Sequence, residues 1–199
     1  MVFPTTQQFD ALKEIVNIGV GRAASSLNEM LEAHIELKVP SLCIFDPNDP
    51  QSYPSYLNVD KISCVQMSFL GKFNGTSALV FPPESAIKLV STLTGQVEGT
   101  PEMDAVMVGT LNEVGNILLN GVMGTFANVL DLTFDYTFPN YCEAPLDQLI
   151  TSSKPNLVLL AQTNFEVKSM EIAGHIFLFF ELNDFEKLIK MLSGLYGDQ

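Results

Sequence analysis

The sequence predicts an α+β domain with pseudo-twofold symmetry, in which one unit of helix, strand, loop, hairpin and helix occurs twice. Three observations support this prediction: a gapless internal repeat, an amphipathic helix pattern that opens each copy, and alternating strand patterns that follow each helix. The copies span about 1–98 and 99–199. We expect a single domain in which both copies join one continuous, mainly antiparallel sheet, with the two long helices adjacent on one side.

A shift of 99 positions aligns the two copies without a gap. It places GTSALVFPPESAIKLVSTLTG (75–95) on GHIFLFFELNDFEKLIKMLSG (174–194), with Gly, Leu, Phe, Lys, Leu, Leu and Gly at matching positions. Further matches occur in the opening segments and are Leu12/Leu111, Glu14/Glu113, Asn17/Asn116, Ile18/Ile117, Leu31/Leu130, Pro40/Pro139 and Cys43/Cys142. The second half therefore repeats the first.

The first copy opens with apolar residues at three-to-four spacing, which predicts a helix over 6–33. In the second copy, Pro101 at a first helical position predicts a helix over 100–130. An alternating strand follows each helix, and each should end at a proline, Pro40 or Pro139, because proline donates no ladder hydrogen bond. Hairpins are then expected near 62–70 with 76–81 and near 163–171 with 175–181. A short helix closes each copy, with Gly95 and Gly194 as C-cap glycines.

Composition excludes several classes of function. The chain has 199 residues, 47% of them apolar, and a net charge of −13 with only 10 Lys and Arg. A basic surface is needed to bind nucleic acid or anionic membranes, so neither is expected as a partner. No long apolar run or secretory signal is present, so membrane insertion is not expected either. Three widely spaced cysteines fit a reduced compartment, and we expect a cytoplasmic protein.

One stripe of polar residues stands out on the first predicted helix. Asp10, Glu14 and Asn17 fall within about 60° of one another on a helix. Taken alone, this stripe is more often an ordinary solvated face. However, the repeat restores Glu113 and Asn116 at the same spacing, although other polar positions on the two helices differ. The retained Glu/Asn pair therefore indicates a function for both stripes.

The pattern Asp-x-x-x-Glu-x-x-Asn, followed by 22 residues and proline, resembles the signature of the CheC/CheX/FliY family of chemotaxis phosphatases. Asp10, Glu14, Asn17 and Pro40 complete this pattern. The second copy keeps Glu113, Asn116 and Pro139, whereas Gly109 stands where the family has Asp or Ser. The length, the tandem units and the two motif copies are most similar to CheC, which implies a monomer with an internal pseudo-twofold axis.

The resemblance implies that the protein hydrolyses the aspartyl phosphate of a CheY-like response regulator, in chemotaxis or another two-component pathway. Asn17 and Asn116 would orient the attacking water, while Glu14 and Glu113 would dock a lysine of the regulator. Asp10, Pro40 and Pro139 would support the motif. An amide can both donate and accept hydrogen bonds, so it suits the first role without a tuned pKa.

The chain itself is expected to bind no cofactor and no metal. It has no P-loop, and its two histidines, His34 and His175, have no partners at zinc spacing. The Mg²⁺ that neutralises phosphoryl charge is expected from the regulator. One alternative stays open: a non-catalytic adaptor of the same fold that binds a regulator, a flagellar switch or a CheD-like deamidase.

Overall fold

The computed structural model describes residues 4–31, 34–47, 61–96, 101–153, 157–167 and 170–196. Helices and antiparallel strands alternate along the chain, which confirms the predicted α+β class. In chain order, the elements are α1 Thr6–Leu31, β1 Ile35–Phe45, β2 Ile62–Gly71, β3 Gly75–Phe81, α2 Pro83–Thr94, α3 Pro101–Leu130, β4 Phe134–Tyr136, β5 Asn140–Ala144, α4 Leu146–Ser153, β6 Leu157–Val167, β7 Met170–Phe180 and α5 Leu182–Tyr196. None of the helices in these ranges is long and apolar enough to cross a membrane.

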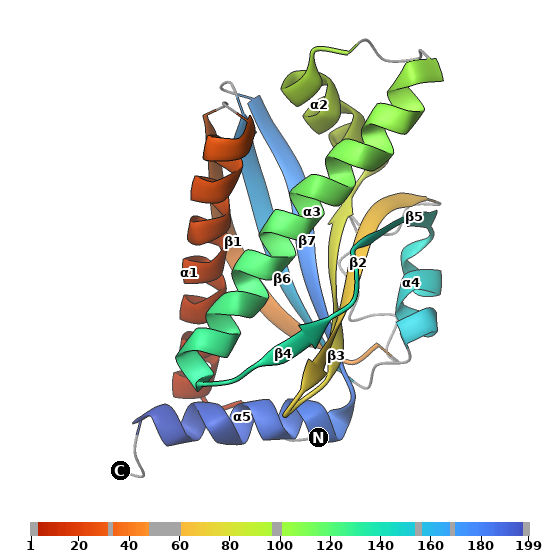
Figure 1. Cartoon of the computed structure of the whole chain (residues 1–199). Helices are drawn as coiled ribbons and strands as arrows, with labels where there is room; N and C mark the ends of the chain where they lie inside the picture. Colours follow the sequence, from red (N-terminus) through yellow and green to blue (C-terminus); the bar gives the residue numbers. More distant parts are fainter. Residues whose placement is uncertain are drawn as a thin grey trace.

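The strands form one continuous sheet, as predicted. Its order is β1-β6-β7-β3-β2-β4, with β5 also paired to β2, and every pair is antiparallel (Figure 1). Strand β1 pairs with β6, and strands β4 and β5 pair with β2. Each proposed half thus lends its first strand to the hairpin of the other. This order is compatible with a twofold repeat, and the boundaries at 1–98 and 99–199 stay a prediction.

Helices α1 and α3 lie on the same face of the sheet and cross each other in opposite directions (Figure 1). Their contact is unusually close, because a Cβ added at Gly19 would lie 2.6 Å from the Cα of Val122. A Cβ added at Gly121 would lie 2.9 Å from the Cβ of Ala23. Glycines inside helices cost about 1 kcal/mol each relative to alanine, and here the close helix packing offsets that cost.

Two apolar clusters pack against the two faces of the sheet. The larger cluster lies between the sheet and helices α1, α2, α3 and α5, and its largest side chains include Phe69, Phe73, Phe126 and Phe180. The smaller cluster covers the opposite face, where Leu146 and Leu149 of α4 contact strand residues. Both sides of the central strands are therefore buried, which explains the continuous apolar runs in β6 and β7.

The two motif prolines behave differently. The predicted strand break at Pro139 is confirmed, because β4 ends at Tyr136 and β5 begins at Asn140. The prediction that a strand ends at Pro40 is wrong: β1 continues to Phe45, with a register shift between Lys38 and Ser41. Strand β1 is an edge strand, so a residue without an N–H can lie at an irregularity there without removing a ladder bond.

Other element boundaries also differ from expectation. Gly95 is the predicted C-cap, with φ of 73° and its N–H bonded to Ser91 O at 2.9 Å. Gly194 is not a C-cap, because α5 continues to Tyr196. The second hairpin begins about six residues earlier than predicted, as β6 Leu157–Val167 and β7 Met170–Phe180. The segment predicted as a loop before it contains β5 and α4.

Candidate functional site

The first stripe lies on the outward side of α1. Asp10 and Glu14 are exposed and Asn17 is partly exposed. Their neighbours Ala11, Leu12, Ile15 and Val16 are all buried in the core under the helix. The apolar spacing therefore fixes the rotation of α1 and turns the Asp/Glu/Asn stripe away from the sheet.

The second stripe occupies the equivalent side of α3. Glu113 is exposed and Asn116 is partly exposed, while Leu111, Val114 and Leu118 are buried. Gly115 sets α3 close to the sheet, because a Cβ there would lie 2.6 Å from Cγ1 of Val65 on β2. Both Glu/Asn pairs therefore face away from the sheet on the two long helices, as predicted.

The helix crossing separates the two stripes. The close contact is at Gly19 on α1 and at Gly121 and Val122 on α3. At 1.5 Å per residue, Asn17 lies roughly 3 Å and Asn116 roughly 8 Å along its helix from the crossing. Because the helices run in opposite directions, the two asparagines lie on opposite sides of it (Figure 1). The two stripes are therefore separate polar surfaces rather than parts of one surface.

The amide of Asn116 is engaged within α3. Nδ2 of Asn120 donates to Oδ1 of Asn116 at 2.7 Å and to its backbone O at 2.8 Å. Among the described residues, the side chain of Asn17 has no such partner, and the position equivalent to Asn120 is Gly21. Sequence reasoning missed Asn120, although the 99-residue shift already aligns it with Gly21. The second stripe thus carries a restraint that the first lacks.

The N-terminal ends of the two stripes also differ. Asp10 is exposed at the start of the first stripe, and Gly109 occupies the equivalent position on α3. A Cβ added at Gly109 would meet nothing within 4 Å. Packing among the described residues therefore does not require glycine at position 109. The absence of a carboxylate there changes only the exposed surface of α3.

Pro139 is partly exposed in the segment between β4 and β5. The preceding residue, Phe138, is 94% exposed, whereas the equivalent Val39 is partly buried in β1. The backbone of Pro40 lies within β1, but its side chain is outside the described residues.

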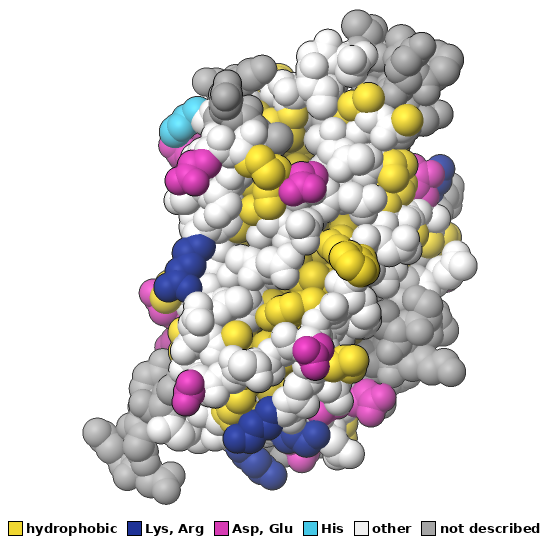
Figure 2. All heavy atoms as spheres, in the orientation of Figure 1, with side chains coloured by type: hydrophobic (Ala, Val, Ile, Leu, Met, Phe, Trp, Pro, Cys, Tyr) yellow, Lys and Arg dark blue, Asp and Glu magenta, His cyan; other side chains and the backbone are white. Residues whose placement is uncertain are grey.

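The helical face combines sparse charge with exposed apolar side chains. Figure 2 shows a broken band of apolar side chains across this face, with acidic side chains standing singly and basic ones gathered at the left edge and lower end. Ile18 beside Asn17 and Val108 beside Gly109 are 37% and 38% exposed. Apolar surface around a few polar groups is typical of a protein-binding face.

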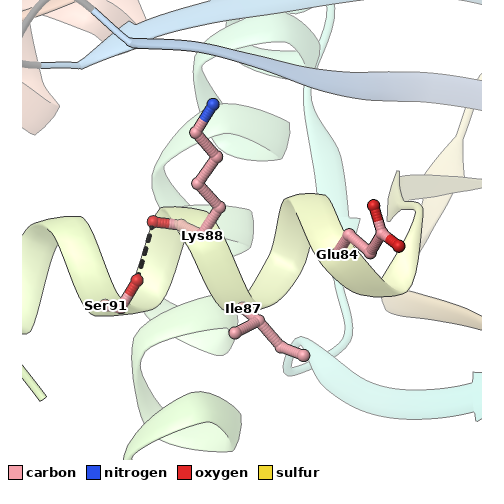
Figure 3. A pocket seen from close by; sticks show the side chains of 4 residues that line it. All are labelled: Glu84, Ile87, Lys88 and Ser91. Atoms are coloured by element: carbon pink, nitrogen blue, oxygen red, sulfur yellow. Dashed lines mark hydrogen bonds between the residues drawn. The ribbon is translucent and has the colours of Figure 1, made fainter. Parts of the chain in front are cut away.

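Two hollows elsewhere offer no comparable chemistry. The hollow on α2 has a volume of about 430 Å³, and its lining side chains Glu84, Ile87 and Lys88 diverge rather than converge (Figure 3). A second hollow of about 440 Å³ lies between the start of α1 and β1 and is lined by Phe9, Leu42 and Cys43 among others. Neither brings together the acid, base and nucleophile that catalysis within a pocket requires.

The histidines do not form a site either. His175 is buried in β7, and burial lowers its pKa to about 4, so the imidazole is neutral near pH 7. His34 is exposed and lies 3.4 Å from Glu36. Across the described ranges, no three His, Cys, Asp or Glu side chains come close enough together to hold a metal ion.

Comparisons with known proteins fit this geometry. A model of the CheC-like family matches residues 8–44, the segment that carries Asp10, Glu14, Asn17 and Pro40. A CheY-P phosphatase CheC of Bacillus subtilis is 24% identical over 201 residues, covering 94% of both chains. The crystal structure of Thermotoga maritima FliY superposes with a TM-score of 0.75 at 19% identity, covering 98% of this chain and 100% of the other. These matches agree with the similarity to CheC-like proteins that the motif indicated, and the superposition on FliY shows a shared fold.

A third similar structure includes a bound partner. The CheX–CheY–BeF3–Mg²⁺ complex of Borrelia burgdorferi superposes with a TM-score of 0.54 at 19% identity, covering 83% of this chain and 97% of the other. In the present chain, the family match covers the first stripe but not the second, which diverges at Gly109 and Asn120.

Proposed function

We propose that the protein is a phosphatase that hydrolyses the aspartyl phosphate of a phosphorylated CheY-like response regulator. The observation that carries this proposal is the Glu/Asn pair presented twice, on the outward faces of α1 and α3 and on opposite sides of their crossing. The similarity to the CheY-P phosphatase CheC of B. subtilis supports the same substrate class. So does the pairing of CheX with CheY in the B. burgdorferi complex.

Each stripe contains the two groups that this reaction needs. Glu14 and Asn17 are three residues apart on one helix, as are Glu113 and Asn116, which places their Cβ atoms roughly 5–6 Å apart. In the proposed complex, the carboxylate binds a lysine ammonium of the regulator through a charge-assisted hydrogen bond. The neighbouring amide enters the phosphoryl pocket and holds a water in line with the phosphorus–oxygen bond that breaks.

Charge neutralisation is assigned to the partner. A divalent cation supplies electrostatic stabilisation of the phosphoryl oxygens in reactions of this type. The first stripe has two carboxylates and one amide, and the second has one carboxylate and one amide. Neither stripe gathers three His, Cys, Asp or Glu side chains, so these groups suit docking rather than chelation. We therefore place the Mg²⁺ with the regulator and give this chain no cofactor of its own.

The two sites are proposed to be active but unequal. Asn116 must leave its 2.7 Å hydrogen bond with Asn120 before its amide can enter a partner pocket. Breaking one hydrogen bond of this kind costs about 1 kcal/mol, which corresponds to roughly a fivefold loss of rate. The second stripe also lacks a carboxylate equivalent to Asp10. The Asp10/Glu14/Asn17 site is therefore the stronger of the two.

A non-catalytic adaptor is the alternative within the same fold. Such a protein would use the same apolar and acidic helical face to bind a regulator, a flagellar switch component or a CheD-like deamidase without turnover. The exposed Phe138 and Val108 would serve an adaptor as well as an enzyme. Only turnover that depends on the two asparagines separates the alternatives.

The test measures loss of phosphate from a panel of phosphorylated receiver domains in the presence of catalytic amounts of purified protein. The variants are Asn17→Ala, Asn116→Ala and the double variant. Matched controls are Asn128→Ala and Glu29→Ala, which alter exposed residues on the same two helices outside the stripes.

The double variant is expected to lose most activity while still binding the regulator, and Asn17→Ala is expected to lose more than Asn116→Ala. Both controls should retain the parent rate, because exposed helical substitutions change stability by about 0.5 kcal/mol or less. Full activity in the double variant would overturn the water-positioning role. Regulator binding without turnover in the parent protein would establish the adaptor.

A further inference from the structure

Two cysteines lie directly opposite each other on neighbouring strands. The antiparallel register of β2 and β5 pairs Cys64 with Cys142, although they are 78 residues apart in the chain. Directly opposed residues in antiparallel strands have Cα atoms about 4.5–5.5 Å apart. Disulfides span Cα separations of about 4.4–6.8 Å, so these backbone positions can accept an S–S bond with little movement.

The two thiols have different surroundings. Cys64 is 1% exposed on the sheet face that contacts α4, and Cys142 is partly exposed beside it. The side-chain amide of Gln66 on β2 contacts Cys142, with Nε2 donating to Sγ at 3.2 Å. The Cys64 thiol also donates to this sulfur, and these bonds lower the pKa of Cys142 to about 6.

The negative charge of Glu143 does not cancel the lowering of the Cys142 pKa. Glu143, the next residue on β5, acts to raise the pKa of Cys142, but its carboxylate is paired with Lys61 and accepts a hydrogen bond from Tyr141. The pKa of Cys64 moves in the opposite direction, well above its usual value, because its proton is held by the Cys142 sulfur and its surroundings are apolar. The hydrogen bond between the two sulfurs therefore favours ionisation of Cys142, the more exposed thiol, over Cys64.

We propose that Cys64 and Cys142 form a peroxide-sensitive dithiol that closes into a disulfide between β2 and β5. The thiolate of Cys142 attacks one oxygen of hydrogen peroxide, the O–O bond breaks, and the departing hydroxide takes a proton to become water. Cys142 is oxidised to a sulfenic acid. The sulfur of Cys64 then attacks it, the S–OH bond breaks, and the hydroxide leaves as water with the proton of Cys64. Two thiols and one peroxide give one disulfide and two waters.

The order of these steps follows from the hydrogen bond. Once Cys142 is a sulfenic acid, its negative charge is gone, and the interaction that held the proton on Cys64 disappears with it. Cys64 then becomes available as the resolving thiol at the position where the new bond must form. Its burial protects it from direct oxidation before that point.

The disulfide would act on β5, the strand that follows Pro139. Strand β5 has five residues, pairs with β2 and begins directly after Pro139. A disulfide would fix this short edge strand to β2. The expected effect is slower backbone hydrogen exchange over 140–144 in the oxidised protein than in the reduced protein.

Cys43 supplies an internal control. It is exposed on β1 and lies opposite Leu160, so no thiol faces it across the strands, and burial of its sulfur raises its pKa. At pH 7 a thiol with a pKa of about 6 is roughly 90% thiolate, against about 1% or less for one above 9. A thiolate of lower pKa is also a weaker nucleophile, which offsets part of the larger thiolate fraction of Cys142. Cys142 should therefore react with peroxide about threefold or more faster than Cys43.

The experiment treats the reduced full-length protein with hydrogen peroxide at pH 7 and maps cysteine-containing peptides by mass spectrometry without reduction. A Cys64–Cys142 cross-linked peptide, lighter by two hydrogens than the two reduced peptides, is expected in the parent and in Cys43→Ser. In Cys64→Ser, dimedone should trap Cys142 as the sulfenic acid. Cys142→Ser should form no internal disulfide.

The parent protein alone decides the outcome, even if a variant folds poorly. A Cys43-containing disulfide as the main product, or oxidation of Cys43 before Cys142, would overturn the proposal. So would conversion of Cys142 to sulfinic acid with Cys64 still reduced. Dithiothreitol should restore the reduced masses and the faster hydrogen exchange over 140–144.

Discussion

The close packing of α1 against α3 can be tested by substituting two glycines of α1. A Cβ added at Gly19 would lie 2.6 Å from Cα of Val122 and 3.1 Å from the backbone O of Gly121. Ordinary carbon–carbon contacts are about 3.5–4.0 Å, so α1 and α3 would have to separate by roughly 1 Å. A Cβ added at Gly21, only two residues away, would meet nothing within 4 Å.

The two substitutions should therefore change stability in opposite directions. Alanine gains about 1 kcal/mol over glycine in a helix at either position. At Gly19 the clash is with backbone, which cannot rotate away, so the overpacking cost should lie near the upper end of its usual range, about 3 kcal/mol. We expect Gly19→Ala to lower the free energy of unfolding by about 2 kcal/mol and Gly21→Ala to raise it by about 1 kcal/mol.

Urea unfolding followed by far-UV circular dichroism measures both changes. The midpoint should fall for Gly19→Ala and rise for Gly21→Ala, with the slope unchanged if both remain two-state. Gly109→Ala on α3, where an added Cβ also meets nothing within 4 Å, should behave like Gly21→Ala. Equal midpoints for Gly19→Ala and Gly21→Ala would refute the close packing of the two helices.

Three further predictions concern the second site, the surface and the core. In an Asn17→Ala background, Asn120→Ala should raise the remaining phosphatase rate roughly fivefold, because Asn116 no longer has to break a hydrogen bond; an unchanged or lower rate would contradict this. Phe138→Ser should weaken regulator binding in a titration without lowering the thermal midpoint, because Phe138 is 94% exposed. His175 has its folded pKa depressed to about 4, so its contribution to stability is full above pH 6.5 and is lost as pH falls toward 4. That loss is about 3 kcal/mol, and His175→Gln should remove this part of the pH dependence of urea unfolding.

Periodic patterns predicted the long elements well. Both long helices begin and end within about two or three residues of expectation, because amphipathic spacing persists through them and Pro101 marks the start of α3. The second hairpin was predicted too late, because the run LVLLA has no alternation and both faces of β6 are covered. Helix α4 was missed because its Ser-rich end reads as a loop.

The stripes could be predicted, but their side-chain contacts could not. Helical spacing alone places Glu14 with Asn17 and Glu113 with Asn116. The bond between Asn120 and Asn116 depends on rotamers that no spacing rule fixes. Similarly, the repeat pairs Cys142 with Cys43, whereas the sheet register places it opposite Cys64. Contacts between distant strands follow from topology, which the repeat pattern alone does not determine.

The glycines of the two long helices fall into two groups, one in close packing contact and one without neighbours at the position of a Cβ. Gly19, Gly115 and Gly121 have heavy atoms within 3 Å of an added Cβ, so close packing offsets their helix-propensity cost. Gly21, Gly109 and Gly124 have nothing within 4 Å, and the first two lie on the polar stripes, one turn from Asn17 and Glu113. No packing contact in the described part of the chain compensates for the roughly 1 kcal/mol that each of these glycines costs. A bare backbone beside a Glu/Asn pair instead suits a surface that another protein must approach closely, which is what the proposed insertion of an asparagine into a regulator pocket requires.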